Sequence, residues 1–83
     1  MIRVLFFARL REQLGQSELE FSVTPGLATV ADLRCTLSER GDNWREALAS
    51  DKLICAVNQV QAMPDQAVAD GDEVAFFPPV TGG

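Results

Sequence analysis

The chain has 83 residues, of which 47% are hydrophobic, and its 7 basic and 12 acidic side chains give a net charge of −5. This length corresponds to one small domain that can still build one hydrophobic core. Nucleic acids and anionic membranes bind basic surfaces, so the acidic composition disfavours both and favours, if anything, a basic protein partner. The chain has no histidine, which excludes a Ser/His/Asp or Cys/His catalytic site made by this chain alone.

The two cysteines, Cys35 and Cys55, are too few and too far apart in sequence to predict a disulfide framework or a metal site. We therefore expect no bound metal, and two buried or half-buried thiols in a reducing cytoplasm. No apolar run approaches the roughly 20 residues of a membrane span. The apolar start MIRVLFFARL is followed by REQLGQ rather than by a small-residue cleavage site. We interpret it as a strand and not as a signal peptide.

Residues 2–8 (IRVLFFA) have the β-branched and aromatic composition of a strand. Apolar side chains occupy both faces of this strand, because side chains alternate along it. Leu5 and Phe7 share one face with Arg3, and the other face carries Ile2, Val4 and Phe6.

Residues 9–14 predict one short helical turn, which stops at Gly15. Residues 17–23 (SELEFSV) then alternate between polar and apolar side chains, which indicates a half-buried strand. Pro25 and Gly26 place a loop after that strand.

Two helices are predicted in the middle of the chain. Thr29, followed by Asp32 three positions later, resembles a capping box and indicates a helix start. Apolar residues then recur at helical spacing, at Val30, Leu33 and Leu37. Gly41 is expected to end this helix. A second, shorter helix is predicted from Asp42, with Trp44 as a core residue rather than a binding platform.

Three strands are predicted in the last third. Residues 52–58 (KLICAVN) read as a buried strand, and residues 59–63 pair back on it after a tight turn. Asp70 and Asp72 flank Gly71, and this spacing predicts a turn rather than an acid–base pair. The last strand follows, with its side chains alternating over residues 73–77.

This order of elements indicates an α+β fold, with one sheet and helices packed on one of its faces. The first and last strands both carry apolar residues on the face that the helices do not cover. If these strands are central neighbours, four residues form an apolar patch there that is typical of a partner surface: Leu5, Phe7, Ala75 and Phe77. The alternative is that the side chains of Arg3 and Glu73, or a loop, cover the patch.

The sequence ends in FFPPVTGG. Pro78 and Pro79 fix their own φ angles and favour extended geometry before them. The segment from Pro78 to Gly83 reaches about 20 Å at most, at ~3.3–3.6 Å per residue. Its tip offers only backbone and a carboxylate, which suits entry into the narrow active site of another protein.

The sequence resembles a known family at these points. A Gly-Gly end after an apolar strand is similar to the ubiquitin-like β-grasp proteins. More narrowly, VLFFARLREQLG, AVNQ and DGDEVAFFPPVTGG resemble the MoaD family, the small sulfur-carrier subunits of molybdopterin synthase. The resemblance implies an α+β, β-grasp domain over residues 1–77 with a mixed sheet of about five strands and helices on one face. It also implies an extended, flexible tail over residues 78–83.

The same resemblance implies the chemistry. An ATP-dependent adenylating enzyme of the ubiquitin-activating type would adenylate Gly83, and sulfur from a persulfide carrier would then leave a thiocarboxylate on it. The tail would thread into a pocket of the large subunit, through Pro78, Pro79, Val80, Thr81 and Gly82. There it would give its sulfur to cyclic pyranopterin monophosphate, and two deliveries would form the dithiolene of molybdopterin. The assembly implied has two large and two small subunits, and this chain binds no cofactor itself.

Other functions stay open at this stage. A carrier of the same fold could serve thiazole synthesis or tRNA thiolation, and an activated glycine could also be conjugated to a lysine amine. A passive ubiquitin-like interaction module, in which the tail has no role, belongs to a different class. Removal of Gly82 and Gly83 separates that last case, because a passive module would keep its activity.

Overall fold

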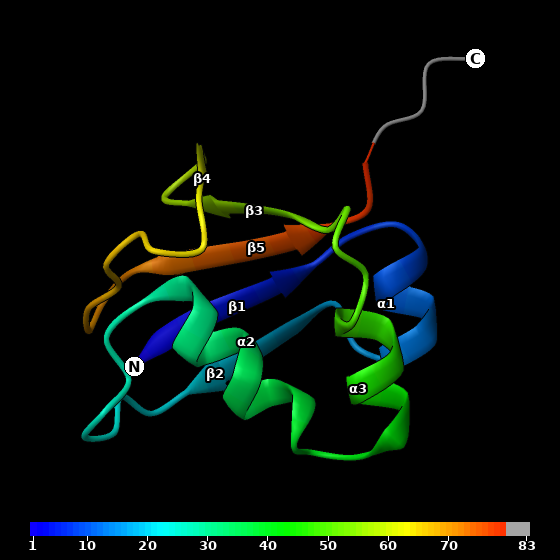
Figure 1. Cartoon of the computed structure of the whole chain (residues 1–83), viewed down its shortest axis with the longest axis horizontal. Helices are drawn as coiled ribbons and strands as arrows, with labels where there is room; N and C mark the ends of the chain where they lie inside the picture. Colours follow the sequence, from blue (N-terminus) through cyan, green and yellow to red (C-terminus); the bar gives the residue numbers. More distant parts are fainter. Residues whose placement is uncertain (80–83) are drawn as a thin grey trace.

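The structure is a computed structural model that describes residues 1–79. The strands are β1 (Ile2–Phe6), β2 (Glu18–Phe21), β3 (Ile54–Val57), β4 (Val60–Ala62) and β5 (Glu73–Phe77). The helices are α1 (Arg9–Leu14), α2 (Val30–Ser38) and α3 (Asp42–Leu48). Figure 1 shows the three helices together on one side of the sheet, as the sequence predicted.

The five strands form one mixed sheet in the order β2-β1-β5-β3-β4. Strands β1 and β5 are parallel central neighbours, with Val4 opposite Val74 and Phe6 opposite Phe76. The other pairs are antiparallel. A parallel pair needs a crossover connection between its strands, and α2 and α3 lie in that connection. The condition for the predicted apolar patch, that the first and last strands are central neighbours, is therefore met.

The core lies between the helices and one face of the sheet. Phe6 and Phe76 are stacked with ring centroids 6.4 Å apart, and both are essentially unexposed. Trp44 of α3 meets Phe6 edge-on at 5.5 Å and is only 6% exposed, which confirms it as a core residue. Burial of each such side chain contributes about 1.5–3 kcal/mol. The same core contains Ile2, Val4, Val74, Leu33 and Leu37.

Helix α2 begins with the predicted capping box, but its end differs from the prediction. The Asp32 carboxylate accepts hydrogen bonds from the backbone N–H groups of Ala28 and Thr29, both at 3.0 Å. The helix ends at Ser38 with an ordinary right-handed cap, so no glycine is needed to close it. Gly41 has an extended φ of 163° and instead precedes α3, where its carbonyl accepts from the N–H of Arg45 at 3.0 Å.

Tight turns close the sheet at the end where β5 begins. Asn58 and Gln59, with φ of 51° and 70°, form the two-residue turn between β3 and β4. The Asn58 side chain donates to Asp72 at 3.1 Å and accepts from the N–H of Glu73 at 3.0 Å. Asp70 pairs with the N-terminal amine. Asp70 and Asp72 are therefore turn residues, as predicted.

Strand β5 ends at Phe77. Residues 80–83 lie outside the described part of the chain, so the proposed division into a domain over 1–77 and a tail over 78–83 stays a prediction. Among residues 1–79, no helix combines the length and the apolar composition that a membrane crossing requires.

Candidate functional site

The four residues predicted as a partner surface lie together on the sheet face opposite the core. We call Leu5, Phe7, Ala75 and Phe77 the open-face patch. Leu5 and Ala75 are directly opposite each other across the β1–β5 pair. The rings of Phe7 and Phe77 meet edge-on, with centroids 6.4 Å apart and planes at 74°. Phe7 is 47% exposed, Leu5 and Phe77 are half-buried and Ala75 is buried, so the accessible apolar surface of the patch lies mainly at Phe7, beside the end of β5.

The patch continues onto β3, where sequence reasoning did not place it. Ile54 lies opposite Phe77, and Ala56 lies opposite Ala75. Which face these two residues occupy depends on the register of β3 against β5, and that register is a long-range feature. The run ICAV offered one signal, because a strand without polar alternation is apolar on both faces.

A charged border lies on the same face, at the start of β1. Arg3 pairs with Glu18 at 2.8 Å and with Glu73 at 3.6 Å. Because Arg3 and Glu18 are more than half exposed, these pairs contribute little to stability. At the opposite end of the patch, beyond the end of β1, Phe7 remains exposed. The alternative in which the Arg3 and Glu73 side chains cover the patch is therefore not supported there.

The root of the tail adjoins both the open-face patch and the helices. Pro78 is half-buried and Pro79 is exposed. Both line an open groove of about 700 Å³ together with residues of α1, α3 and the loop before β3, among them Ala8, Arg9, Glu46 and Lys52. The predicted tail residues Val80, Thr81 and Gly82, and the predicted reactive residue Gly83, lie outside the described residues.

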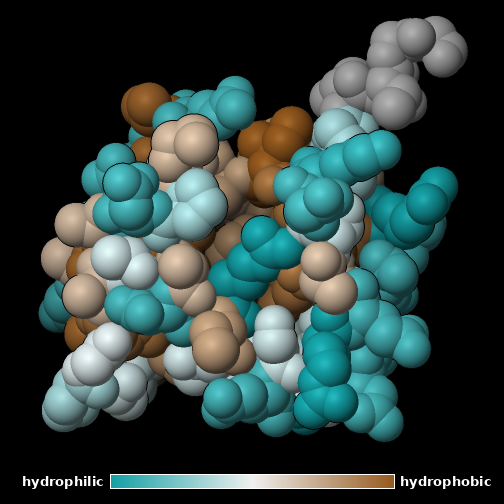
Figure 2. All heavy atoms as spheres, viewed as in Figure 1, coloured by the Kyte–Doolittle hydropathy of each residue, from teal (hydrophilic) through white to brown (hydrophobic). Residues whose placement is uncertain are grey.

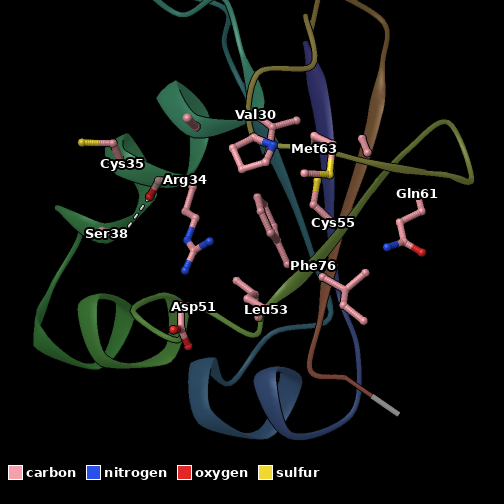
Figure 3. Close-up of a pocket in the computed structure, with 14 residues that line it drawn as sticks. Val30, Arg34, Cys35, Ser38, Asp51, Leu53, Cys55, Gln61, Met63 and Phe76 are labelled. Carbon is pink, nitrogen blue, oxygen red and sulfur yellow. Dashed lines mark hydrogen bonds between the residues drawn. The ribbon is translucent and has the colours of Figure 1, made fainter.

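A second groove, of about 500 Å³, lies between α2 and the β3–β4 hairpin (Figure 3). Figure 2 shows apolar atoms in the hollow at the centre of this view, with hydrophilic side chains around it. Arg34 lines this groove, but its guanidinium donates to the carbonyl oxygens of Leu48 at 2.7 Å and Ser50 at 2.6 Å. Arg34 therefore ties α2 to the end of α3 and is not free to hold an anion with all its donors.

Both cysteines line the same groove, and the buried one lacks the environment of a nucleophile. Burial raises the pKa of the Cys55 thiol to about 11, so it stays protonated at neutral pH. The expectation that both thiols are at least half-buried is wrong for Cys35, which is exposed. Leu33 and Leu37 take the inner face of α2, which turns Cys35 outward. Within residues 1–79, no three His, Cys, Asp or Glu side chains gather as a metal site would require.

The sequence profile of the ThiS family matches residues 4–83. The chain belongs to the ThiS family. This ThiS-family chain is 49% identical to the molybdopterin synthase sulfur carrier subunit of Escherichia coli (strain K12) over 83 residues, which is 100% of both chains. It is also similar to the crystal structure of SAMP1 from Haloferax volcanii, with 33% identity, a TM-score of 0.76, and 99% and 98% of the two chains covered.

A further similar structure is a complex of subunits 1 and 2 of the molybdopterin-converting factor from Helicobacter pylori 26695. Its matching chain is 23% identical, with a TM-score of 0.69, and the match covers 99% of this chain and 97% of that one. At this identity the likeness concerns the fold alone. Together these findings confirm the β-grasp fold and the membership among molybdopterin synthase sulfur carriers that the two ends of the sequence predicted.

Proposed function

We propose that this ThiS-family chain carries sulfur for a molybdopterin synthase as a thiocarboxylate on Gly83. The observation that carries the proposal is the 49% identity to a molybdopterin synthase sulfur carrier subunit over the whole of both chains. The described residues support a carrier rather than a catalyst. The chain has no histidine, and the high pKa of the Cys55 thiol makes it a poor nucleophile.

The proposed loading reaction makes an unreactive carboxylate into an acyl donor. A Gly83 carboxylate oxygen attacks the α-phosphorus of ATP on an adenylating enzyme, which releases pyrophosphate and forms an acyl-adenylate. A sulfur nucleophile derived from a persulfide then attacks the acyl carbon and displaces AMP. When the nucleophile is the persulfide itself, the product is an acyl disulfide, which a thiol then reduces. A thiocarboxylate remains on Gly83, the thiol and the donor sulfur form a disulfide, and ATP cleavage supplies the driving force.

The proposed delivery takes place on a large subunit. The open-face patch would dock against that subunit and orient the tail, while Pro78 and Pro79 would aim it into the active site. The large subunit would supply the basic residues that bind the anionic precursor, cyclic pyranopterin monophosphate. Because the dithiolene contains two sulfurs, two loaded carriers are consumed, in keeping with an assembly of two large and two small subunits.

The apolar surface near the tail supports this docking. Phe7 and Phe77 together present aromatic area next to Pro78, and aromatic side chains are enriched among residues that dominate binding energy. A neighbouring structure of the same fold is itself a complex of two molybdopterin-converting factor subunits. The open face is thus the surface we assign to the large subunit.

The test is ATP-dependent loading of the purified chain by a molybdopterin-synthase adenylating enzyme with sulfide as the sulfur source. Intact mass spectrometry should show a sulfur-for-oxygen increase that requires ATP and maps to Gly83. Loaded chain mixed with a large subunit and cyclic pyranopterin monophosphate should then yield molybdopterin. A chain that loads but gives no molybdopterin would point to thiazole synthesis or tRNA thiolation. Failure to load, with the fold intact, would refute the carrier itself.

The same samples also test the alternative in which the chain is conjugated to other proteins. Conjugation would appear as a covalent adduct between the chain and a lysine of another protein, with loss of water rather than gain of sulfur. A chain lacking Gly82 and Gly83 serves as the control in every arm. Full activity of that shortened chain would support the passive module.

A further inference from the structure

Ala8 connects the open-face patch to helix α1 through a strained turn. The N–H of Leu10 donates to the carbonyl oxygen of Phe7 at 3.2 Å, which closes a four-residue turn with Ala8 in its second position. The backbone of Ala8 has φ 55° and ψ −129°. These are the angles of the second residue of a type II′ turn, where glycine is the usual residue because a Cβ is crowded there.

The other residues with positive φ have an evident local reason. Asn58 and Gln59 form the β3–β4 turn, whose two residues must both be left-handed. The remaining positive-φ residues among 1–79 are glycines, at positions 15, 26 and 71. Ala8 is thus the described residue at which an L-side chain occupies a position that only glycine adopts readily.

The fold itself gives no reason for the methyl group of Ala8. The residue is exposed and takes no part in the hydrophobic core. Glycine would form the same turn without strain and without leaving a cavity. Strained residues of this kind cluster at functional sites, so the reason for the Ala8 methyl group lies outside the isolated domain.

Hydrogen bonds on either side of Ala8 indicate which parts of the molecule the strained turn connects. On one side, the N–H of Phe7 donates to the carbonyl oxygen of Phe76 at 3.3 Å, which ties the turn to β5. On the other side, the carbonyl oxygen of Ala8 accepts from the N–H of Arg11 at 3.2 Å, which ties it to α1. Ala8 also lines the groove at the tail root beside Pro78. The turn therefore sets where the Phe7 ring stands relative to Phe77 and the tail.

We propose that Ala8 is a positioning residue for docking to the large subunit: its methyl group restricts the turn and holds Phe7 against Phe77 before the partner arrives. The inference rests on the proposed function, since it concerns the same surface. Glycine at this position would let the turn sample many backbone angles. The half-exposed Phe7 ring would then have to be ordered during association, at a cost in affinity.

The test compares Ala8→Gly with the unmodified chain in two measurements. The melting temperature by circular dichroism should rise by about 2–8 °C, because relief of strain outweighs the added freedom of the unfolded chain. The Kd for a molybdopterin synthase large subunit, by isothermal titration calorimetry, should rise about two- to tenfold, the cost of ordering one side chain. Ala31→Gly, at an exposed helical position of α2, is the matched control and should lower the melting temperature with unchanged Kd.

Two further variants test whether Ala8→Gly weakens binding by loosening the backbone of the turn or by another effect. D-alanine at position 8, introduced by chemical synthesis, suits these angles because they mirror the extended region of L-residues. That variant should melt higher and still bind within about twofold of the unmodified chain, since its turn remains restricted. In a Phe7→Ala background, Ala8→Gly should cost no further affinity, because the two residues act through one ring.

Motion in the free chain is measured separately by ¹⁵N relaxation. Ala8→Gly should lower the order of the Phe7 and Ala8 amides, and D-alanine should not. The inference is overturned if Ala8→Gly lowers the melting temperature, leaves Kd and amide order unchanged, or binds no worse than the D-alanine variant. If the unmodified chain does not bind the large subunit at all, the proposed function is wrong, and the relaxation data still decide whether Ala8 restrains the turn.

Discussion

The two faces of the β1–β5 pair carry the same kinds of side chain and use them differently. On the core face, Phe6 and Phe76 stack with ring centroids 6.4 Å apart and are essentially unexposed. On the open face, Phe7 and Phe77 meet at the same centroid distance, 6.4 Å, yet Phe7 is 47% exposed. Hydrophobic composition therefore does not tell folding residues from binding residues here, whereas the side of the strand does.

This contrast separates three kinds of change. Substitutions on the core face should lower stability, and those on the open face should lower the affinity for the large subunit. Changes at Gly83 should abolish sulfur loading while stability and affinity stay unchanged.

The largest effect is expected at the chain end. Deletion of Gly83, or a residue added after it, shifts the carboxylate by about 3.3–3.6 Å, and far smaller displacements already cost large factors in rate. Thiocarboxylate formation should be abolished, while the melting temperature by circular dichroism stays nearly unchanged. A tag at the N-terminus is the control and should be tolerated far better. Full loading of an uncleaved, C-terminally tagged chain would contradict the mechanism.

The next effect concerns stability. Phe76→Ala removes a ring that is fully buried against Phe6 and should destabilise the domain by about 3–5 kcal/mol. Chemical denaturation provides the free energy of unfolding. A smaller loss for Phe76→Ala than for Phe77→Ala would mean that the two faces are assigned the wrong way round.

Phe77→Ala should chiefly affect binding. Its ring lies in the open-face patch, and an aromatic anchor there contributes about 1–3 kcal/mol to association. The Kd for the large subunit should rise accordingly, and the domain should lose less stability than with Phe76→Ala. Unchanged affinity in a well-folded Phe77→Ala chain would remove the open face from the docking surface.

The cysteines should be dispensable for sulfur loading. Burial holds the pKa of the Cys55 thiol at about 11, and Cys35 is exposed. A chain with Cys35→Ser and Cys55→Ala should load sulfur on Gly83 at the parental rate. In the parent chain, an alkylating reagent at neutral pH should modify Cys35 well before Cys55. Loss of loading in the folded double variant would implicate a thiol in the transfer.

The smallest effect is a pH dependence at the start of α2. Hydrogen bonds from the backbone of Ala28 and then Thr29 hold the pKa of Asp32 below its ordinary value of 3.8. A lowered pKa in the folded state contributes stability above that ordinary value, and this contribution is lost as the pH falls through the folded pKa. Asp32→Asn should therefore melt below the parent at neutral pH, and the difference should shrink below about pH 4. An equal difference at all pH values would exclude the charge as its cause.

Much of the candidate site was accessible from the sequence. Alternation along residues 2–8 and 73–77 assigned the correct face to each phenylalanine, because a strand's side chains point to opposite faces whatever lies around it. The roles of the open-face patch and of Gly83 stay predictions, and Gly83 lies outside the described residues.

The two incorrect predictions from the sequence, for Gly41 and Cys35, also have physical reasons. Gly41 was expected to close α2, but that helix closes with right-handed Glu39, and Gly41 starts α3 instead. Cys35 was expected to be sheltered, but the inner face of α2 was already filled by leucines. In both cases a residue's general preference was outweighed by which neighbours occupied the space.

The sequence by itself determined the features that depend on near neighbours: strand periodicity, the Thr29–Asp32 capping box, the turn at Asn58, and the ends that identify the family. Only the tertiary structure decided the pairing of β3 with β5, which adds Ile54 and Ala56 to the open face. It also decided the hydrogen bond from the Arg34 guanidinium to the carbonyl oxygen of Leu48 at the end of α3. It also decided the backbone angles of Ala8. These features join segments far apart in the chain, so their geometry is set by closure of the whole fold and not by any local pattern.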